Sequence, residues 1–251
     1  MVPVRVKPDR AMQVEACLAT VMDPELDEPV TELGFVTGLE VDGGEVRIAF
    51  RLPTYWCAAN FAFLMADDMR LAVQALPWVT NVRVQLHEHM YADAINSGVA
   101  AGHGFEAAFG AAAEGGLDEL RRTFLRKAFQ RRQQALLEHL LDGGHAAADL
   151  VALDAAALPG LVLDDPEGER RVERYLERRT VAGGGALAFV DVHGQPLEAR
   201  TLARYMHKLQ GVSVNTEFNG ALCRGLLAAR YAQTEPQPIA IVRRTPQAPP
   251  G

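Results

Sequence analysis

The feature that most constrains the fold is a glycine turn, Asp-Gly-Gly at positions 42–44, between two runs in which apolar and polar residues alternate. Alternation with a period of two places the apolar side chains of each run on one face, as a half-buried strand requires. An Asp-Gly pair between two such runs is typical of a β-hairpin. The sequence therefore predicts paired strands over residues 35–41 and 45–52.

Helical patterns flank this hairpin on both sides. Val14 and Leu18 recur at helical spacing within residues 11–22, and apolar residues recur in the same way within residues 58–76. A further alternating run predicts a third strand over residues 79–86. The order helix, strand, strand, helix, strand is typical of a two-layer unit, in which a pair of helices packs against a small sheet.

The rest of the chain divides by composition. Residues 92–116 are rich in alanine and glycine and predict a linker with some helix, and the proline-rich end of the chain is typical of disorder. We therefore expect an α+β chain: a two-layer domain over 1–91, a linker over 92–116, a mostly helical domain over 117–232 and a disordered tail over 233–251. The elements expected in the second domain are helices over residues 117–141, 145–158, 166–179, 198–209 and 217–231, and a strand over 186–192.

The bulk properties exclude several classes of protein. The chain has 251 residues, a net charge of −7 and no apolar run of the roughly 18–20 residues that cross a bilayer. Its polar beginning is unlike a secretory signal, and its three separated cysteines contain no CxxC pair, which argues against a disulfide framework. We therefore expect a cytoplasmic protein that binds neither membranes nor nucleic acid.

Cys57 is the candidate reactive group, because it lies just before the helix predicted over residues 58–76. Unpaired backbone N–H groups and the helix dipole favour an anion at that end, and a cysteine there can have a lowered pKa. Thr54 is close enough in sequence to hydrogen-bond across the loop or to the thiolate. The alternative is that Cys57 is a small buried apolar residue, as free cysteines commonly are. Cys17 and Cys223 lie in helical patterns, and we expect both in the core.

His87 and His89 form a second candidate group, at the end of the third predicted strand. Alternate residues of a strand point the same way, so the two imidazoles would converge on one metal ion. The alternative is that they are exposed polar residues at a strand end.

Several motifs in order carry a resemblance to a known family. Asp-Pro-Glu at 23–25 follows the first helix, Leu-Gly-Phe-Val at 33–36 enters the hairpin, and Thr54 and Cys57 precede the second helix. Over about residues 11–90 the chain resembles the metal–sulfur cluster assembly family, which includes SufT and PaaD. It departs from the family at Ala58, where proline is frequent, and at the histidine-containing end of the third strand.

The resemblance implies a site in which the turn with Asp23 and Glu25 approaches the same end of the domain as Cys57. A thiolate with one or two carboxylates is an incomplete site, since iron or zinc normally takes three or four protein ligands. The resemblance thus implies a factor that holds iron or an iron–sulfur cluster transiently, shares it across a homodimer, or docks a client, and is not itself an enzyme. The alternative for Asp23 and Glu25 is that the Asp-Pro turn only ends the first helix.

The resemblance also implies a partner. Chains with this domain and a helical extension are similar to accessory proteins of bacterial di-iron monooxygenases, so the client would be a metalloenzyme such as a di-iron hydroxylase, handled together with a chaperonin. Two other functions stay open. One is a thiol enzyme with Cys57 as nucleophile and His87 or His89 as base, and the other is a scaffold subunit that performs no chemistry.

Overall fold

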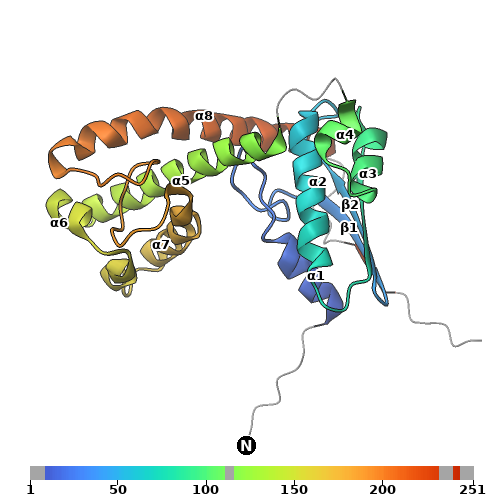
Figure 1. Cartoon of the computed structure of the whole chain (residues 1–251), viewed down its shortest axis with the longest axis horizontal. Coiled ribbons are helices and arrows are strands. Elements are labelled where there is room, and N and C mark those ends of the chain that lie inside the picture. The colour runs from blue at the N-terminus through green and yellow to red at the C-terminus, as the bar shows by residue number, and fades with distance from the viewer. Residues whose placement is uncertain (1–8, 111–115, 232–239, 244–251) are drawn as a thin grey trace, which may run out of the picture. The chain divides into compact units, whose positions relative to one another are not determined.

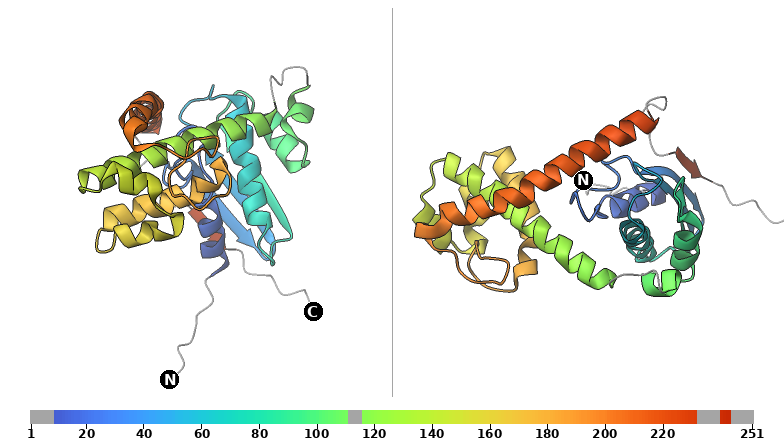
Figure 2. Two further views of the ribbon diagram at one scale, coloured as in Figure 1. Left: turned by 60° about the vertical axis from the view of Figure 1, so that its left-hand side comes forward. Right: turned by 90° about the horizontal axis from the view of Figure 1, so that it is seen from above.

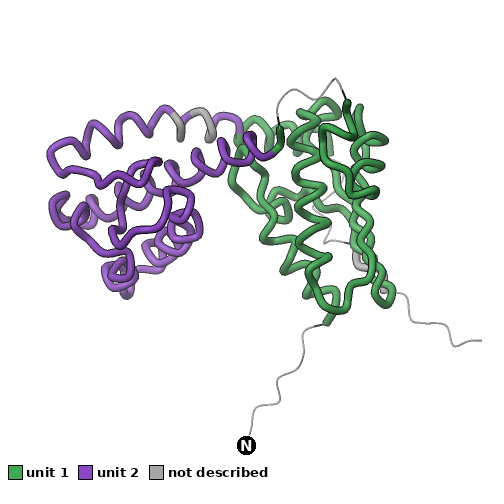
Figure 3. Tube along the Cα trace, viewed as in Figure 1, with its two compact units in different colours: residues 1–117, 220–251 green, residues 118–219 purple. Residues whose placement is uncertain are grey.

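The computed structural model describes residues 9–110, 116–231 and 240–243. The chain divides into two units, of which unit 1 comprises Met1–Leu117 with Gly220–Gly251 and unit 2 comprises Asp118–Asn219 (Figure 3). The C-terminal end of the last helix therefore belongs to the same unit as the N-terminal elements, although about a hundred residues separate them in sequence.

Unit 1 is built on one four-stranded sheet with the strand order β3-β2-β1-β4. Figure 1 labels β1 and β2 of this sheet. β1 and β2 form the antiparallel hairpin predicted around the glycine turn, β3 pairs in parallel with β2, and β4 pairs in parallel with β1. The α+β fold class is confirmed. The elements of unit 1 are α1 (Arg10–Leu18), β1 (Val36–Asp42), β2 (Glu45–Arg51), α2 (Ala59–Gln74), β3 (Asn81–His87), α3 (Ala92–Ala100), α4 (Phe105–Phe109), the end of α8 (Ala199–Tyr231) and β4 (Ala240–Arg243).

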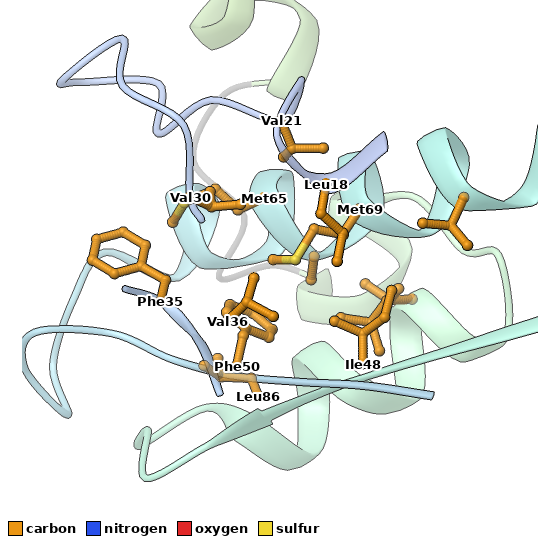
Figure 4. Packing of buried hydrophobic residues seen from close by; sticks show 14 of the residues in the cluster. Leu18, Val21, Val30, Phe35, Val36, Ile48, Phe50, Met65, Met69 and Leu86 are labelled. Carbon is orange, nitrogen blue, oxygen red and sulfur yellow. The ribbon is translucent and has the colours of Figure 1, made fainter. Parts of the chain in front are cut away.

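One face of this sheet carries the core of unit 1. Alternate residues of β2 and β3 are buried, and helices α1 and α2 cover that face (Figures 1 and 2). Figure 4 shows Leu18 of α1 and Met65 and Met69 of α2 near Ile48 and Phe50 of the hairpin. Burying side chains of this size contributes roughly 1.5–3 kcal/mol each, so the alternation seen in the sequence is what fixes the two layers.

Residues 92–109 differ from the expected linker, because they form α3 and α4 and pack on unit 1. Ile95, Val99 and Phe105 are buried in the same core as the sheet. The side chain of Asn96 bonds the backbone N–H and C=O of Leu86 at 2.8 and 3.0 Å, which fixes α3 to the end of β3. Small residues let the two helices approach closely, and the same composition is what made the segment resemble a linker.

Unit 2 is helical, as expected for this part of the chain. Its elements are α5 (Leu117–Asp142), α6 (Ala147–Ala152), η2 (Ala155–Leu161), α7 (Pro166–Arg179), η3 (Thr180–Ala182) and the first part of α8. The strand expected over residues 186–192 does not form, and isolated bridges at Leu187 and Val190 stand in its place. The reason is that side chains take its carbonyl groups: Tyr175 and Arg179 donate to Ala188 O, and Gln133 donates to Val190 O.

The end of the chain also differs from the expectation. α8 runs unbroken over Ala199–Tyr231, where the sequence predicts two separate helices over residues 198–209 and 217–231. Within the segment expected to be a disordered tail, Ala240–Arg243 pair with β1 as β4, whereas residues 232–239 and 244–251 lie outside the described part of the chain. In the described ranges, no helix combines the length and the apolar character needed to span a membrane.

Candidate functional site

Cys57 lies in the loop between β2 and α2, one residue before the cap of the helix. The cap residue, Ala58, makes no side-chain hydrogen bond to the helix, and the first turn of α2 contains no acidic residue. The positive end of the helix dipole is therefore not offset by a carboxylate there. The Cys57 Sγ atom lies 3.1 Å from Oγ1 of Thr54, whose side chain is buried. The structure thus places both predicted neighbours, the helix start and Thr54, beside the thiol.

The side chain of His89 fixes this loop by a hydrogen bond to the backbone of Cys57. Its Nε2 atom lies 2.8 Å from the carbonyl oxygen of Cys57, and its Nδ1 atom accepts a hydrogen bond from the backbone N–H of Tyr91 at 3.2 Å. Because Nδ1 accepts, a neutral ring carries its proton on Nε2 and donates it to Cys57. Burial lowers the pKa of His89, which favours this neutral form. The backbone N–H of Met90 also donates to the carbonyl oxygen of Tyr55 at 2.8 Å, so two hydrogen bonds join residues 89–90 to the loop that carries Cys57.

The structure does not bring His87 and His89 together as a pair of ligands. β3 ends at His87, and Glu88 has a φ of 53°, in the left-handed region. The alternation of the strand therefore stops between the two histidines. The side chain of His87 is exposed and that of His89 is buried, so the shared metal site predicted for them does not form.

Asp23 is buried in the turn after α1. Its Oδ1 atom accepts hydrogen bonds from the backbone N–H groups of Glu25 and Leu26, at 2.9 and 2.8 Å. Burial raises the pKa of Asp23 to about 6, although these two hydrogen bonds favour the ionised form. The carboxyl group therefore stabilises the turn that follows α1, which agrees with the alternative that the Asp-Pro turn ends this helix. At neutral pH its buried charge is costly.

Sequence reasoning missed the contribution of α8 to this site. Cys223 is partly buried against the core of unit 1, as Cys57 is. Its pKa is raised to about 11, chiefly by burial and further by the negative charges of Asp23, Cys57 and Glu25. The end of α8 thus brings a second thiol near the predicted site residues. Nothing in the local sequence around Cys223 signals this, since only the tertiary fold brings residue 223 back to the N-terminal unit.

Among the described residues, the donor atoms around Cys57 do not make up a full set of metal ligands. In the parts of the chain that the structure describes, no group of three or more His, Cys, Asp or Glu side chains is arranged to hold a metal ion. Asp23, Glu25 and Cys57 therefore remain predicted ligands, each of which would need further ligands from elsewhere.

In the described part of the chain, the structure places no histidine ring in hydrogen-bond contact with the Cys57 sulfur. Both ring nitrogens of His89 bond backbone groups, and among the described residues no histidine nitrogen hydrogen-bonds to the Cys57 sulfur. A nucleophilic cysteine normally needs such a base within hydrogen-bond distance.

Exposed aromatic and sulfur-containing side chains surround the thiol loop, which comprises residues 52–58 between β2 and α2. Tyr55 and Trp56 directly precede Cys57 and are 50% and 62% exposed, and Met90 and Tyr91 on the segment bonded to this loop are exposed as well. Tyrosine, tryptophan and methionine are enriched at protein–protein interfaces and are costly to leave in water. This surface is suited to contact with another protein.

Fold and site together define a class: a two-layer α+β domain that presents a partly buried thiol at a helix start, on a loop fixed by a buried histidine. Residues 12–85 match the model of a family described as iron-sulfur cluster assembly protein. The match runs from α1 into β3 and includes Asp23, Thr54 and Cys57, but neither His89 nor Cys223. No curated protein matches the chain. The family match supports a role related to iron–sulfur cluster assembly.

Proposed function

We propose that this protein is an accessory maturation factor that assists the assembly or insertion of an iron–sulfur or di-iron centre in a client enzyme. The observation that carries the proposal is the family match over residues 12–85 together with the position of Cys57 inside it, at a helix start and 3.1 Å from Thr54. Iron or an iron–sulfur cluster would be the cargo of this site and not a permanent cofactor.

The shortage of ligands supports a transient role. Cys57 could supply one thiolate, and Asp23 or Glu25 one carboxylate, whereas iron sites and iron–sulfur clusters normally take three or four protein ligands. In the described residues nothing completes that set. The missing ligands would come from a client or from a second copy of the chain, and transfer to the client would then need few bonds to break.

The client itself is a further part of the proposal. The exposed side chains of Tyr55, Trp56 and Met90 around the thiol fit a surface on which another protein docks. By its resemblance to SufT- and PaaD-like proteins with a helical extension, the chain would serve a multicomponent monooxygenase, with a di-iron hydroxylase as client and a chaperonin as helper. Unit 2, which lies outside the family match, would be the client-specific part.

Co-expression with a di-iron hydroxylase tests this function. The iron content of the purified hydroxylase, measured by plasma mass spectrometry, is compared for wild type, Cys57→Ala, Cys17→Ala and cells without the protein. Cys17 is the matched control, because it is also a partly buried thiol packed on the core of unit 1. We expect wild type and Cys17→Ala to give a full iron content and Cys57→Ala to give a content near that of cells without the protein.

Two outcomes would overturn parts of this proposal. If the hydroxylase takes up as much iron without the protein as with it, the maturation role is wrong for this client. If Cys57→Ala supports the same iron content as wild type, Cys57 is not the working group, and the exposed aromatic surface would be tested next by Trp56→Ala.

A further inference from the structure

The last three turns of α8, residues 220–231, lie against the segments that surround Cys57. Gly220 approaches Leu26 so closely that a Cβ atom there would lie 3.4 Å from the leucine Cδ2 atom. Leu227 packs on the core of unit 1, and a Cβ atom at Gly34 would lie 3.9 Å from its Cδ2 atom. Cys223, between these two contact points, is close enough to Cys57 and Asp23 to sense their charges. The helix end therefore passes over the site.

Two arginine–glutamate pairs join this helix end to two segments of the site. Arg224 Nη1 lies 3.0 Å from both carboxylate oxygens of Glu28, in the turn that begins at Asp23. Arg230 Nη2 lies 3.1 Å from the carboxylate of Glu88 and 3.1 Å from its carbonyl oxygen. Glu88 directly precedes His89, the residue that bonds the Cys57 backbone. Both anchors thus belong to segments that form the site.

Tyr231 adds to the second anchor. Its hydroxyl group donates to the Glu88 carboxylate at 3.1 Å, and the guanidinium carbon of Arg51 lies 3.4 Å from the centre of its ring. Stacking of an arginine on an aromatic ring is a favourable contact that water only partly weakens. The end of α8 is therefore fixed at its last residue as well as in its middle.

These contacts are of the kind that a binding partner can replace. The side chains of Arg224 and Glu28 are 52% and 36% exposed, and those of Arg230 and Glu88 are 28% and 55% exposed. Exposed ion pairs are weak and are screened by salt. The side chain of His89, which bonds the backbone of Cys57, is by contrast buried. The loop that carries Cys57 is thus fixed by a buried side chain, while the end of α8 combines apolar packing at Leu227 with ion pairs that are partly exposed to water.

We propose that residues 220–231 of α8 form a clasp over the thiol of Cys57, which closes through the pairs Arg224–Glu28 and Arg230–Glu88 and opens when these pairs are lost. The clasp concerns the site proposed above, but it requires neither a metal nor a client. A partner that presents its own basic side chains to Glu28 and Glu88 has the chemistry to open it.

The rate at which a neutral maleimide alkylates Cys57 tests the clasp. The reference is the full chain with Cys17→Ser and Cys223→Ser, which leaves Cys57 as its one thiol among the three cysteines of the sequence. In this background, Arg224→Glu with Arg230→Glu is expected to raise the alkylation rate at least fivefold. The charge reversal by itself disfavours the thiolate and slows alkylation, so an increase reports access to the sulfur.

Two controls accompany this comparison. Arg200→Glu breaks an exposed arginine–glutamate pair, with Glu198, on the same helix but in unit 2, and it is expected to leave the rate unchanged. Adding Glu28→Arg and Glu88→Arg to the double variant restores both pairs with reversed charges and is expected to return the rate to that of the reference. Added salt screens the two ion pairs and is expected to speed alkylation of the reference.

Three results would overturn the clasp: no increase in the double variant, the same increase in Arg200→Glu, or an increase that the charge-reversed pairs do not restore, since the last indicates general loosening. Because the readout is alkylation of a thiol, these results are independent of whether the protein matures any client. The clasp and the maturation role can therefore fail separately.

Discussion

Replacing Asp23 by asparagine is expected to make unit 1 more stable at neutral pH than the wild type. Burial raises the pKa of this carboxyl group from 3.8 to about 6. Asparagine keeps an Oδ1 atom that accepts the hydrogen bonds from the backbone of Glu25 and Leu26, and it carries no charge. The substitution therefore removes the buried charge and leaves the turn in place.

The size and the sign of the effect follow from proton linkage. The native state holds the Asp23 proton up to about pH 6, whereas the unfolded chain releases it near pH 4. Between these values the native state binds more protons, so the free energy of unfolding of the wild type falls as the pH rises. A shift of roughly two pKa units corresponds to about 3 kcal/mol. Asp23→Asn is expected to gain about this amount above pH 6 and nothing near pH 4.

Urea unfolding followed by tryptophan fluorescence, at intervals from pH 4 to pH 7.5, measures this difference. The two tryptophans of the chain, Trp56 and Trp78, both lie in unit 1, so the signal reports on that unit. His89 acts in the opposite direction, because its lowered pKa makes stability fall as the pH drops below about 6.5. Its contribution is common to both proteins and cancels in the difference between Asp23→Asn and the wild type.

Asp23→Ala is the control, since alanine removes the charge and the hydrogen-bond acceptor together. It is expected to be less stable than Asp23→Asn at every pH by about 1–2 kcal/mol, because the backbone N–H groups of Glu25 and Leu26 lose the Asp23 oxygen as acceptor. A difference between Asp23→Asn and wild type that stays flat from pH 4 to pH 7.5 would show that burial does not perturb this carboxyl group, and the reasoning would be refuted.

Three further predictions concern the helices of both units and the thiol loop. Gly98→Ala is expected to destabilise unit 1 by about 1–3 kcal/mol in urea unfolding, since the new methyl group would lie 2.6 Å from a side chain of α4. Its control is Gly104→Ala, whose methyl group meets nothing within 4 Å, and equal urea midpoints for the two variants would contradict the packing of α3 on α4. His89→Ala is expected to speed backbone hydrogen exchange around Cys57 about tenfold, and unchanged exchange would mean that other contacts hold the loop. Gln133→Leu is expected to lower the stability of unit 2 by about 2 kcal/mol or more, measured by the helical circular dichroism signal, and a loss below about 0.5 kcal/mol would contradict a structural role for this buried amide.

The parts of the fold that the sequence predicts are those with strong local signals. The glycine turn at 42–44 and the alternation around it predict the hairpin, because both depend on residues that are neighbours in the chain. α7 begins at Pro166 with Asp165 as its cap, as the predicted range of 166–179 requires. The placement of Cys57 beside Thr54 at a helix start is predictable for the same reason.

The parts that the sequence does not predict depend on contacts between distant residues. Gly98 and its neighbours have the composition of a linker, and only the fit of α3 against α4 and the core makes them helices. His89 alternates with His87 in the sequence, but the positive φ of Glu88 turns it into the core. Cys223 joins the site because the end of α8 returns to unit 1, and no local pattern encodes that return.

The contrast between the two sides of the thiol loop bears on the proposed function. On one side, the buried ring of His89 bonds the backbone of Cys57, so the sulfur is held in a defined position before any partner arrives. On the other side, the pairs Arg224–Glu28 and Arg230–Glu88 add partly exposed ion pairs to the packing of Leu227 and the stacking of Tyr231 that hold the end of α8. A partner that displaces the end of α8 would have to replace these pairs and the packing of Leu227, and it would meet a thiol that is already positioned. A chain with an incomplete ligand set needs this arrangement if the remaining ligands are to come from its partner.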